Sequence, residues 1–246
     1  FRELKQKIAN PALVAEKAPY LIKFAETEEE VREVQRLRFR VFNEEQGKGL
    51  DSSNQDGIDR DEFDDVSLHL VVRHQEAGAI GTYRVIIGHD NSSVESMYSY
   101  REFDIRGMEN LRASTIEVGR SCVAAGYRNG AVVALLWAGI SNLITRSGMR
   151  YIAGCPSLEE TNPAAGWALY EDFKRRDMLT KKISAEPRPG FVLPRPPQEE
   201  IDAILNDPAR MRELCPPLLK GYIRMGCRLC GPPAFDYEFK TIDFLA

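Results

Sequence analysis

A charged pair lies inside an otherwise apolar stretch of the 246-residue sequence. Glu117 and Arg120 stand among strand-forming residues in the segment TIEVGRSCVAAGYRNGAVVALLW, residues 115–137. The dipeptide at 129–130, Asn-Gly, breaks the chain, and the apolar run after it is typical of a buried helix. A charged strand beside a glycine-containing turn at a helix start can bind a phosphate and carry chemistry next to it. A structural salt bridge in an unrelated α/β protein is the simpler alternative.

The preceding residues predict the elements that must position this pair. Thr27 is followed by three glutamates, so that Thr27 and Glu30 form a capping box at the start of a helix. Two β-rich runs, residues 67–73 and 79–87, are joined by a short polar turn and predict a hairpin. A strand, a turn and a helix then follow in residues 115–137. The order of elements favours an α/β fold.

Two polar side chains fall inside the predicted hairpin. Arg84 needs a partner if it is buried, and Glu117 or Asp64 would serve. His69 is expected to be a hydrogen-bonded core histidine, with a catalytic role as the alternative. The sequence therefore leaves open whether Glu117 or His69 acts as a base.

Bulk properties exclude several classes of function. The net charge of −4, from 33 basic and 37 acidic residues, does not favour nucleic acid as a partner. No apolar run approaches the roughly 20 residues of a membrane span, so we expect a cytoplasmic protein that could contact the inner face of the membrane peripherally. Cys227 and Cys230 form a C-x-x-C, but a zinc site needs about four ligands and no second pair is present. We predict no metal site.

The domain organisation is predicted from one proline-rich segment. Residues 187–197 are too rich in proline for regular structure and could be a domain linker. We interpret them as a surface excursion, because the piece that follows is too small to fold alone. We therefore expect a single domain over residues 1–246, with a core at about 20–180 and a C-terminal extension at 181–246.

Several motifs resemble the GNAT acyltransferase superfamily. EVGRSCV, followed by YR and ALLWAGI, resembles its central strand and cofactor helix. More narrowly, these residues resemble the ornithine-lipid type of N-acyltransferase, a group labelled hemolysin-like and related to the acyl-homoserine-lactone synthases. The motifs R-x-x-V-F, D-x-F-D, G-x-x-R and F-D, and the C-terminal segments, extend the resemblance from about residue 20 to the end. It implies a GNAT fold, with a mixed, mostly antiparallel central sheet flanked by helices, and a C-terminal extension.

The resemblance implies roles for individual residues. Glu117 matches the glutamate of the family's E-x-x-R motif and is the expected general base, acting through a water. Arg120 would keep that carboxylate ionised, and a backbone N–H near Val123 would stabilise the oxyanion. The region that binds the acceptor is expected to contain Arg38, Phe42, Asp61, Asp64, Arg84 and Phe103. The donor's phosphopantetheine is expected at Cys122, Val123, Arg128, Asn129 and Gly130.

A departure from the family pattern indicates the acyl donor. GNAT enzymes that use coenzyme A carry R/Q-x-x-G-x-G/A, whose amides wrap the pyrophosphate, but Ala131 and Val133 stand at the two glycine positions here. This turn fits acyl carrier protein, which presents pantetheine on one phosphodiester, with acyl-coenzyme A as the alternative donor. No tightly bound cofactor is expected. The acidic carrier is predicted to dock on a group of basic residues: Arg146, Arg150, Lys174, Arg175 and Arg176. The alternative interpretation of these residues is an ordinary solvated surface.

The function predicted from these features is N-acylation. A fatty acyl group, 3-hydroxylated, would pass from acyl carrier protein to the amine of an amino acid such as ornithine, giving a lyso-aminolipid. The alternatives among enzymes are an acyl-homoserine-lactone-type signal synthase and a coenzyme-A-dependent N-acetyltransferase. The alternative of another class is a non-catalytic module that binds an acyl carrier or a lipid.

Overall fold

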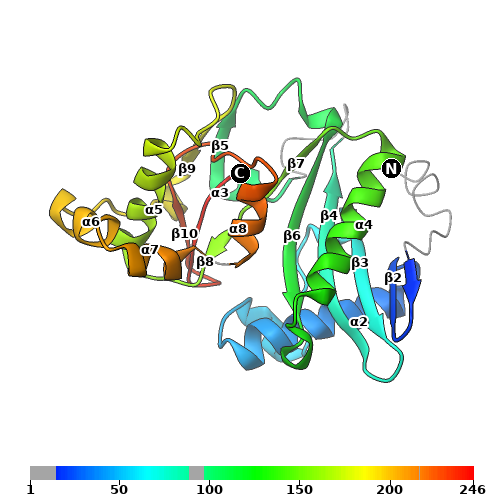
Figure 1. Cartoon of the computed structure of the whole chain (residues 1–246). Helices are drawn as coiled ribbons and strands as arrows, with labels where there is room; N and C mark the ends of the chain where they lie inside the picture. The colour runs from blue at the N-terminus through cyan, green and yellow to red at the C-terminus, as the bar shows by residue number, and fades with distance from the viewer. Residues whose placement is uncertain (1–14, 89–96, 216) are drawn as a thin grey trace. The chain divides into compact units, whose positions relative to one another are not determined.

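The computed structural model describes residues 15–88, 97–215 and 217–246 (Figure 1). The chain divides into two compact units. Unit 1 comprises residues 1–91 and 113–152, and unit 2 comprises residues 92–112 and 153–246. Unit 2 therefore begins well before residue 181, where the C-terminal extension was expected, and it also takes in an earlier segment. That the two units act as a single domain stays a prediction.

Unit 1 is built on a six-stranded sheet in the order β1-β2-β3-β4-β6-β7. Its strands are β1 (Ala15–Lys17), β2 (Tyr20–Phe24), β3 (Ser67–His74), β4 (Gly78–Ile87), β6 (Thr115–Val123) and β7 (Tyr151–Ala153). Each neighbouring pair from β1 to β6 is antiparallel, and β3 with β4 forms the predicted hairpin. The α/β fold with a mostly antiparallel sheet is confirmed.

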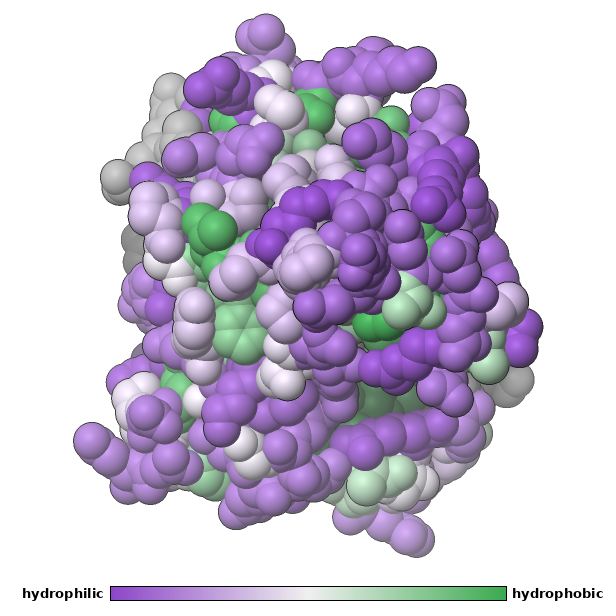
Figure 2. Space-filling model, turned by 90° about the vertical axis from the view of Figure 1, so that its left-hand side faces the viewer, coloured by the Kyte–Doolittle hydropathy of each residue, from purple (hydrophilic) through white to green (hydrophobic). Residues whose placement is uncertain are grey.

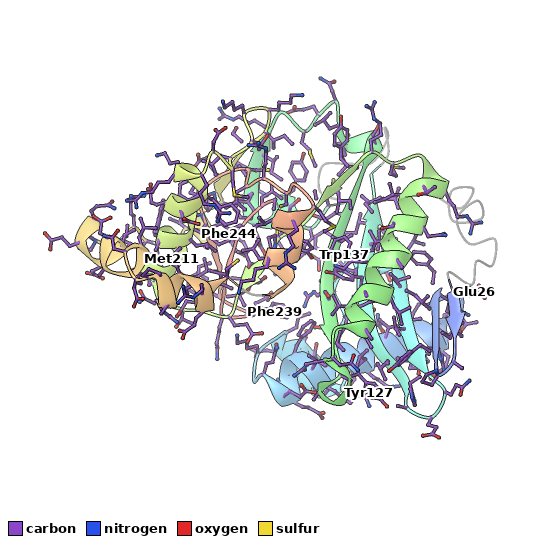
Figure 3. All side chains as sticks on the ribbon, in the orientation of Figure 1. Glu26, Tyr127, Trp137, Met211, Phe239 and Phe244 are labelled. Atoms are coloured by element: carbon purple, nitrogen blue, oxygen red, sulfur yellow. The ribbon has the colours of Figure 1, made fainter. Side chains whose placement is uncertain are left out.

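Helix α4 (Ala131–Ser147) covers one face of this sheet (Figure 1). A small residue permits the close approach, because a Cβ added at Gly139 would lie 2.7 Å from Leu70 Cδ2 and 2.9 Å from Ile22 Cδ1. Trp137 of α4 packs edge-on against Tyr83 with ring centroids 6.0 Å apart (Figure 3). The apolar run after residue 130 is thus a helix packed on the sheet, as the sequence predicts.

Helix α2 (Glu28–Phe39) contacts β3, β4 and β6 on the opposite face. It begins with the predicted capping box, in which Glu30 N donates to Thr27 Oγ1 at 3.2 Å and Thr27 N donates to the Glu30 carboxylate at 3.4 Å. Its apolar face joins a buried cluster with residues of β3, β4 and β6: Val34, Leu37, Val41, Val71, Ala79 and Cys122. The helix continues into a π-helical turn, η1 (Arg40–Glu45). Short 3₁₀ turns complete the unit: η2 (Asp51–Gln55), η3 (Asp64–Val66), η5 (Arg112–Ser114), which spans the unit boundary, and η6 (Ala125–Tyr127).

The described residues of unit 2 form five α-helices and several short strands. Its elements are α3 (Ser99–Glu102), β5 (Phe103–Arg106), β8 (Ser157–Leu158), α5 (Pro163–Arg175), β9 (Ser184–Pro187), η7 (Pro189–Phe191), α6 (Gln198–Leu205), α7 (Pro208–Leu214), α8 (Pro217–Arg224), β10 (Ala234–Asp236) and β11 (Thr241–Asp243). Strands β5 and β9 pair antiparallel, as do β10 with β11 and β11 with β8. The core of this unit includes Phe173 and Phe244, both fully buried. Phe244 is labelled in Figure 3.

The proline-rich segment is more ordered than the sequence predicts. Pro187 pairs with Phe103 between β9 and β5, and Leu193 is buried in the core of unit 2. The interpretation of this segment as a surface excursion is therefore wrong in part, because strand pairing at Pro187 and the burial of Leu193 hold it against unit 2. Among the described residues, no helix is long and apolar enough to cross a membrane.

Candidate active site

Six charged side chains of unit 1 form a closed ring of alternating ion pairs. Each guanidinium group lies near two carboxylates, and each carboxylate lies near two guanidinium groups. In order, the ion-pair ring consists of Arg38, Asp59, Arg120, Asp61, Arg84 and Asp64. All six side chains are at most 6% exposed. The ring is neutral as a whole, which is how six charges can be buried together.

Arg38 brings α2 into the ring. Its Nε donates to Asp59 Oδ1 at 2.7 Å, and its two terminal nitrogens donate to the Asp64 carboxylate at 2.6 and 2.8 Å. Burial by itself lowers the pKa of Arg38, but the hydrogen bond to Asp64 and the charges of both aspartates raise it above its usual value. Burial by itself raises the pKa of Asp64, yet Arg38 and Arg84 together hold it well below its usual range. Both groups therefore remain charged at neutral pH.

Arg84 lies on β4 beneath α2. Its guanidinium is 2.5 Å from Asp61 Oδ1 and 3.7 Å from Asp64 Oδ2. Glu117 or Asp64 was the expected partner of a buried Arg84; Asp64 does lie near it, but Asp61 is nearer. A contact with Glu117 stays a prediction. Burial by itself raises the pKa of Asp61, but Arg84 and Arg120 lower it.

A β-bulge directs Arg120 into the ring. Gly119 lies opposite Arg84 and Cys122 lies opposite Thr82, so β6 takes three steps where β4 takes two. Arg120 has φ of +48°, a left-handed conformation that costs a non-glycine residue about 1 kcal/mol. Its guanidinium reaches Asp59 Oδ2 at 3.2 Å and Asp61 Oδ2 at 2.8 Å. The carboxylates that Arg120 neutralises thus include two aspartates, while its predicted effect on Glu117 stays a prediction.

Asp59 is the ring member that the sequence analysis missed. It is fully buried, and it joins Arg38 of α2 to Arg120 of β6. Its backbone also receives a hydrogen bond from Arg38, and its N–H donates to Gln35 O at 3.2 Å. It lies in a polar, acidic stretch, residues 51–65, in which only Asp61 and Asp64 matched a family motif. Charge balance was the available signal, because three buried arginines require three carboxylates.

Glu117 lies on the sheet face that carries the ring. It is 3% exposed and lies opposite Ile86, two residues from Arg84, so strand alternation places Glu117 and Arg84 on one face. This buried carboxylate near the start of β6 is the residue that the sequence analysis predicts as the general base. Its role as the base stays a prediction.

His69 is buried on the same face, opposite Arg84 on β3. Its Nε2 is 3.3 Å from Asp64 O and 3.7 Å from Asp64 Oδ1. Burial lowers the pKa of His69 to about 4, and the charge of Arg38 adds to this effect while Asp64 opposes it. A histidine with this pKa is a weak proton acceptor, which favours its interpretation as a core residue.

The end of β6 offers a backbone donor at an edge of the strand. Ala124 N donates to Ile80 O of β4 at 2.8 Å, so in an extended strand the preceding N–H, that of Val123, points to the other edge. On that side β7 has three residues against nine in β6, too few to pair along the whole strand. This edge could therefore accept a strand-like pantetheine arm. Cys122 points instead into the core under α2, where burial raises the pKa of its thiol to about 12.

The turn between β6 and α4 forms as expected, but its Arg128 already contacts other groups of the protein. Asn129 Oδ1 accepts from Ala131 N at 3.1 Å, and Gly130 has φ of +85° at the start of α4. Arg128 Nε donates to Val123 O at 2.9 Å, and its terminal nitrogen lies 2.5 Å from Glu45 Oε2 of η1. A donor phosphate at Arg128 would therefore compete with Glu45.

The remaining predicted residues are distributed over both units. Phe42 is partly buried and packs against the apolar cluster under α2. Phe103 is buried in β5 of unit 2. Of the predicted carrier-docking residues, Arg146 and Arg150 belong to unit 1, and Lys174, Arg175 and Arg176 belong to unit 2. Arg176 pairs with Asp172 at 3.1 Å and Arg175 lies 3.9 Å from Asp202. The roles of all these residues stay predictions.

Comparisons with known proteins identify the family. Residues 37–138 match an acetyltransferase (GNAT) domain. The chain is 30% identical over 238 residues to the L-ornithine N(alpha)-acyltransferase of Brucella abortus (strain 2308), covering 90% of this chain and 81% of that protein. This chain belongs to the L-ornithine N(alpha)-acyltransferase family. A second member, from Agrobacterium fabrum (strain C58), is 30% identical over 236 residues, covering 91% of this chain and 78% of that protein.

The family assignment confirms the predicted enzyme class, an acyltransferase of the GNAT superfamily. The matched GNAT segment begins one residue before Arg38 and contains every member of the ion-pair ring, Glu117 and the turn before α4. Among solved structures, the acyl-homoserine-lactone (AHL) synthase LasI is similar, with a TM-score of 0.41 and 13% identity, covering 65% of this chain and 79% of that chain.

Proposed function

We propose that this acyltransferase moves a fatty acyl group, 3-hydroxylated, from the phosphopantetheine thioester of acyl carrier protein to the α-amine of ornithine. The product is a lyso-aminolipid and the free thiol of the carrier. The observation that carries this proposal is the 30% identity, over 90% of the chain, to an L-ornithine N(alpha)-acyltransferase.

Glu117 acts as the general base in this proposal. An α-amine is largely protonated at neutral pH and must lose a proton before it can attack. Glu117, through a water, accepts that proton; the amine nitrogen then bonds to the thioester carbon. The C–S bond breaks, and the sulfur leaves as a thiolate that takes up a proton. A positioned general base contributes about 10²- to 10⁴-fold to the rate.

The backbone N–H of Val123 stabilises the oxyanion. Negative charge develops on the thioester oxygen as the amine attacks, and a fixed N–H aimed at it lowers the barrier. The alternation of N–H groups at the end of β6 supports this role, because Ala124 donates to β4 and Val123 therefore points away from it. A pantetheine arm laid along this edge presents its carbonyl near Val123.

The ion-pair ring keeps the elements around the site in position. Its arginines and aspartates saturate one another and are almost fully buried, which favours positioning over direct contact with the acceptor. The ring joins α2, the loop before β3, β4 and β6, so it fixes the strand that carries Glu117 and Val123. Arg38, Asp61, Asp64, Arg84 and the newly recognised Asp59 belong to this group.

Acyl carrier protein is the proposed donor because the phosphate turn is poor in glycine. Ala131 and Val133 carry side chains where amides would otherwise close around a pyrophosphate. A carrier protein needs only one phosphodiester, for which Arg128 and the start of α4 suffice. Contact with the membrane surface would be peripheral. The face in Figure 2 is mostly hydrophilic, with hydrophobic residues in small separate areas, so it offers no broad apolar surface for insertion.

An assay with defined substrates tests the proposal. Purified protein is incubated with 3-hydroxyacyl carrier protein and L-ornithine, and products are identified by mass spectrometry. We expect N-acylornithine, with matched acyl-coenzyme A a poorer donor and lysine or homoserine poorer acceptors. Turnover of acetyl-coenzyme A with an amine, but of no long-chain donor, would instead indicate an N-acetyltransferase. Binding of the donor without turnover of any acceptor would indicate a non-catalytic module.

A further inference from the structure

A second cluster of buried charged residues lies in unit 2. Glu102 is the last residue of α3, Asp236 ends β10 and Asp243 ends β11. One carboxylate oxygen from each lies within 4.8 Å of those of the other two. The three residues are 0%, 3% and 4% exposed. None of them belongs to the ion-pair ring or to the residues proposed for acyl transfer.

The hairpin of β10 and β11 brings two of these carboxylates together. Asp236 pairs with Thr241 in the antiparallel register, and Asp243 is two residues further along β11. Because alternate residues point to one face, Asp236, Thr241 and Asp243 share that face. Asp236 is held in place by Tyr98 Oη at 3.2 Å, Glu238 N at 2.8 Å and Phe239 N at 3.0 Å. Tyr98 also precedes α3, the helix that ends at Glu102.

A hydroxyl group on the same face provides a second observation. Thr241 is 6% exposed, and its Oγ1 has no hydrogen-bond partner among the described residues. It lies directly opposite Asp236 and next to Asp243 on the face that carries the cluster. A buried hydroxyl without a partner is unusual, since buried polar atoms are nearly always hydrogen-bonded or bound to a ligand. An oxygen ligand for a cation would account for this position.

We propose that Glu102, Asp236, Asp243 and Thr241 bind a hard divalent cation, with Ca²⁺ preferred over Mg²⁺. Carboxylate and hydroxyl oxygens are the ligands that these ions take. Oxygen atoms on opposite sides of Ca²⁺ are about 4.6 to 5.2 Å apart, so oxygens that all lie within 4.8 Å of one another can surround it. Mg²⁺ demands shorter bonds and near-ideal octahedral geometry, which three side chains fixed by separate elements meet less readily.

The bound cation would join elements that are distant in the sequence. It would tie the end of α3 to the β10–β11 hairpin, across more than 130 residues of chain. No metal site was predicted from the sequence, because its cysteines and histidines lack the spacing of metal ligands. The three carboxylates are too far apart in the chain to form a recognisable motif. The cation would stabilise unit 2, and it takes no part in the proposed acyl transfer.

Metal titration of the purified full chain tests this inference. The protein is treated with a chelator, desalted, and titrated separately with CaCl₂, MgCl₂ and TbCl₃. Calorimetry gives the stoichiometry, and thermal unfolding gives the change in Tm. We expect one equivalent of Ca²⁺ to bind, a rise in Tm of several degrees, and displacement of luminescent Tb³⁺ by Ca²⁺.

Variants assign the binding to these residues. Asp243→Asn should lose the Ca²⁺-dependent rise in Tm, and Thr241→Val should weaken Ca²⁺ binding while Thr241→Ser retains it. Glu238→Gln is the matched control, since this carboxylate lies in the same hairpin but is exposed and outside the cluster. If Asp243→Asn does not fold, the wild-type stoichiometry and the two Thr241 variants still decide. Absence of saturable binding to the wild type at millimolar Ca²⁺ would overturn the proposal, as would equal binding by Thr241→Val and Thr241→Ser.

Discussion

At the scale of single residues, the six members of the ion-pair ring depend on one another. Each buried charge is compensated by two neighbours, so removing any one of them leaves two partners under-compensated in a dry environment. Motif resemblance found five of the six members. Asp59 was missed because it lies in an acidic stretch without periodicity, and its partners come from α2 and β6, far away in the sequence.

Asp59→Asn tests whether the ring positions the catalytic strand. The amide keeps the shape of the side chain but cannot neutralise Arg38 and Arg120. Breaking a buried ion pair costs about 3 to 5 kcal/mol, so we expect a lower Tm. Because Arg120 is displaced, kcat should fall about tenfold or more with KM for ornithine nearly unchanged. Asp65→Asn, an exposed neighbour in the same loop, should leave both quantities unchanged. A normal kcat in folded Asp59→Asn would limit this residue to a structural role.

Glu117→Gln tests the proposed base directly. The amide is isosteric and cannot accept the amine's proton, so kcat should fall by about 10²-fold or more while Tm changes little. The pH–rate profile separates catalysis from positioning, since the variant's remaining rate should rise with pH as free amine accumulates. Near-normal turnover at neutral pH would show that Glu117 is not the base. His69 would then be the remaining candidate.

His69 makes stability depend on pH. Its folded-state pKa of about 4 lies below the usual 6.5, so the unfolded chain binds a proton more readily between these values. The stabilisation is complete above about pH 6.5 and is lost as pH falls toward 4, by about 3 kcal/mol in total. The depressed carboxyl groups Asp61 and Asp64 contribute stability that is lost only at lower pH. Urea unfolding at pH 7.0 and 4.5 measures the effect, which His69→Gln should largely abolish. An unchanged pH dependence in that variant would assign it to other groups.

At the scale of elements, the sequence predicted those helices and strands that depend on interactions between neighbouring residues. The capping box at Thr27 and the hairpin of β3 and β4 need only neighbouring residues, and both were predicted. The bulge at Arg120 was not, because its cause is the pairing of β6 with β4 and the ion pairs to a distant loop. Likewise, no local pattern reveals that Phe103 pairs with Pro187.

The contact between η1 and the turn before α4 leads to a prediction about donor affinity. Glu45 occupies the guanidinium of Arg128 and would repel a phosphate there. In Glu45→Gln, Arg128 is released, so KM for the acyl donor should fall about two- to fivefold, the range expected for an exposed ion pair, with kcat unchanged. Glu44→Gln is the matched control, because Glu44 is an exposed neighbour and Arg128 forms its ion pair with Glu45 instead. A higher KM in Glu45→Gln would show that Glu45 orders Arg128 for binding.

At the scale of the whole molecule, the predicted fold class is confirmed, while the single-domain organisation stays a prediction. The resemblance of several motifs to the GNAT superfamily implied its sheet and helices, and this fold is confirmed. The division into two units was not foreseen, because unit 2 combines residues 92–112 with residues 153–246. Pairing between strands that are distant in the sequence, such as β5 and β9, brings the two segments of unit 2 together. The amino-acid composition therefore does not mark where one unit ends and the other begins.

The choice of donor is a property of the whole surface and can be tested by salt. Acyl carrier protein is acidic, so its association with basic residues should weaken as ionic strength rises, whereas chemistry in the buried site should not. We expect kcat/KM for acyl carrier protein to exceed that for matched acyl-coenzyme A by about tenfold or more at low salt, and to fall several-fold between 0.05 and 0.3 M NaCl, as expected when screening shortens the Debye length from above to below about 10 Å.

Paired charge variants locate the docking surface for the carrier. Arg146→Gln with Arg150→Gln removes basic residues of unit 1, and Lys174→Gln with Arg175→Gln removes those of unit 2. Because Arg175 already has an acidic neighbour at 3.9 Å, the unit 1 pair should raise KM for the carrier donor more than the unit 2 pair. Acyl-coenzyme A, which has no protein surface to dock, serves as the control donor and should be little affected by either pair. Equal kcat/KM for the two donors, without a salt effect on the carrier reaction, would contradict the assignment of acyl carrier protein and favour coenzyme A as the natural donor.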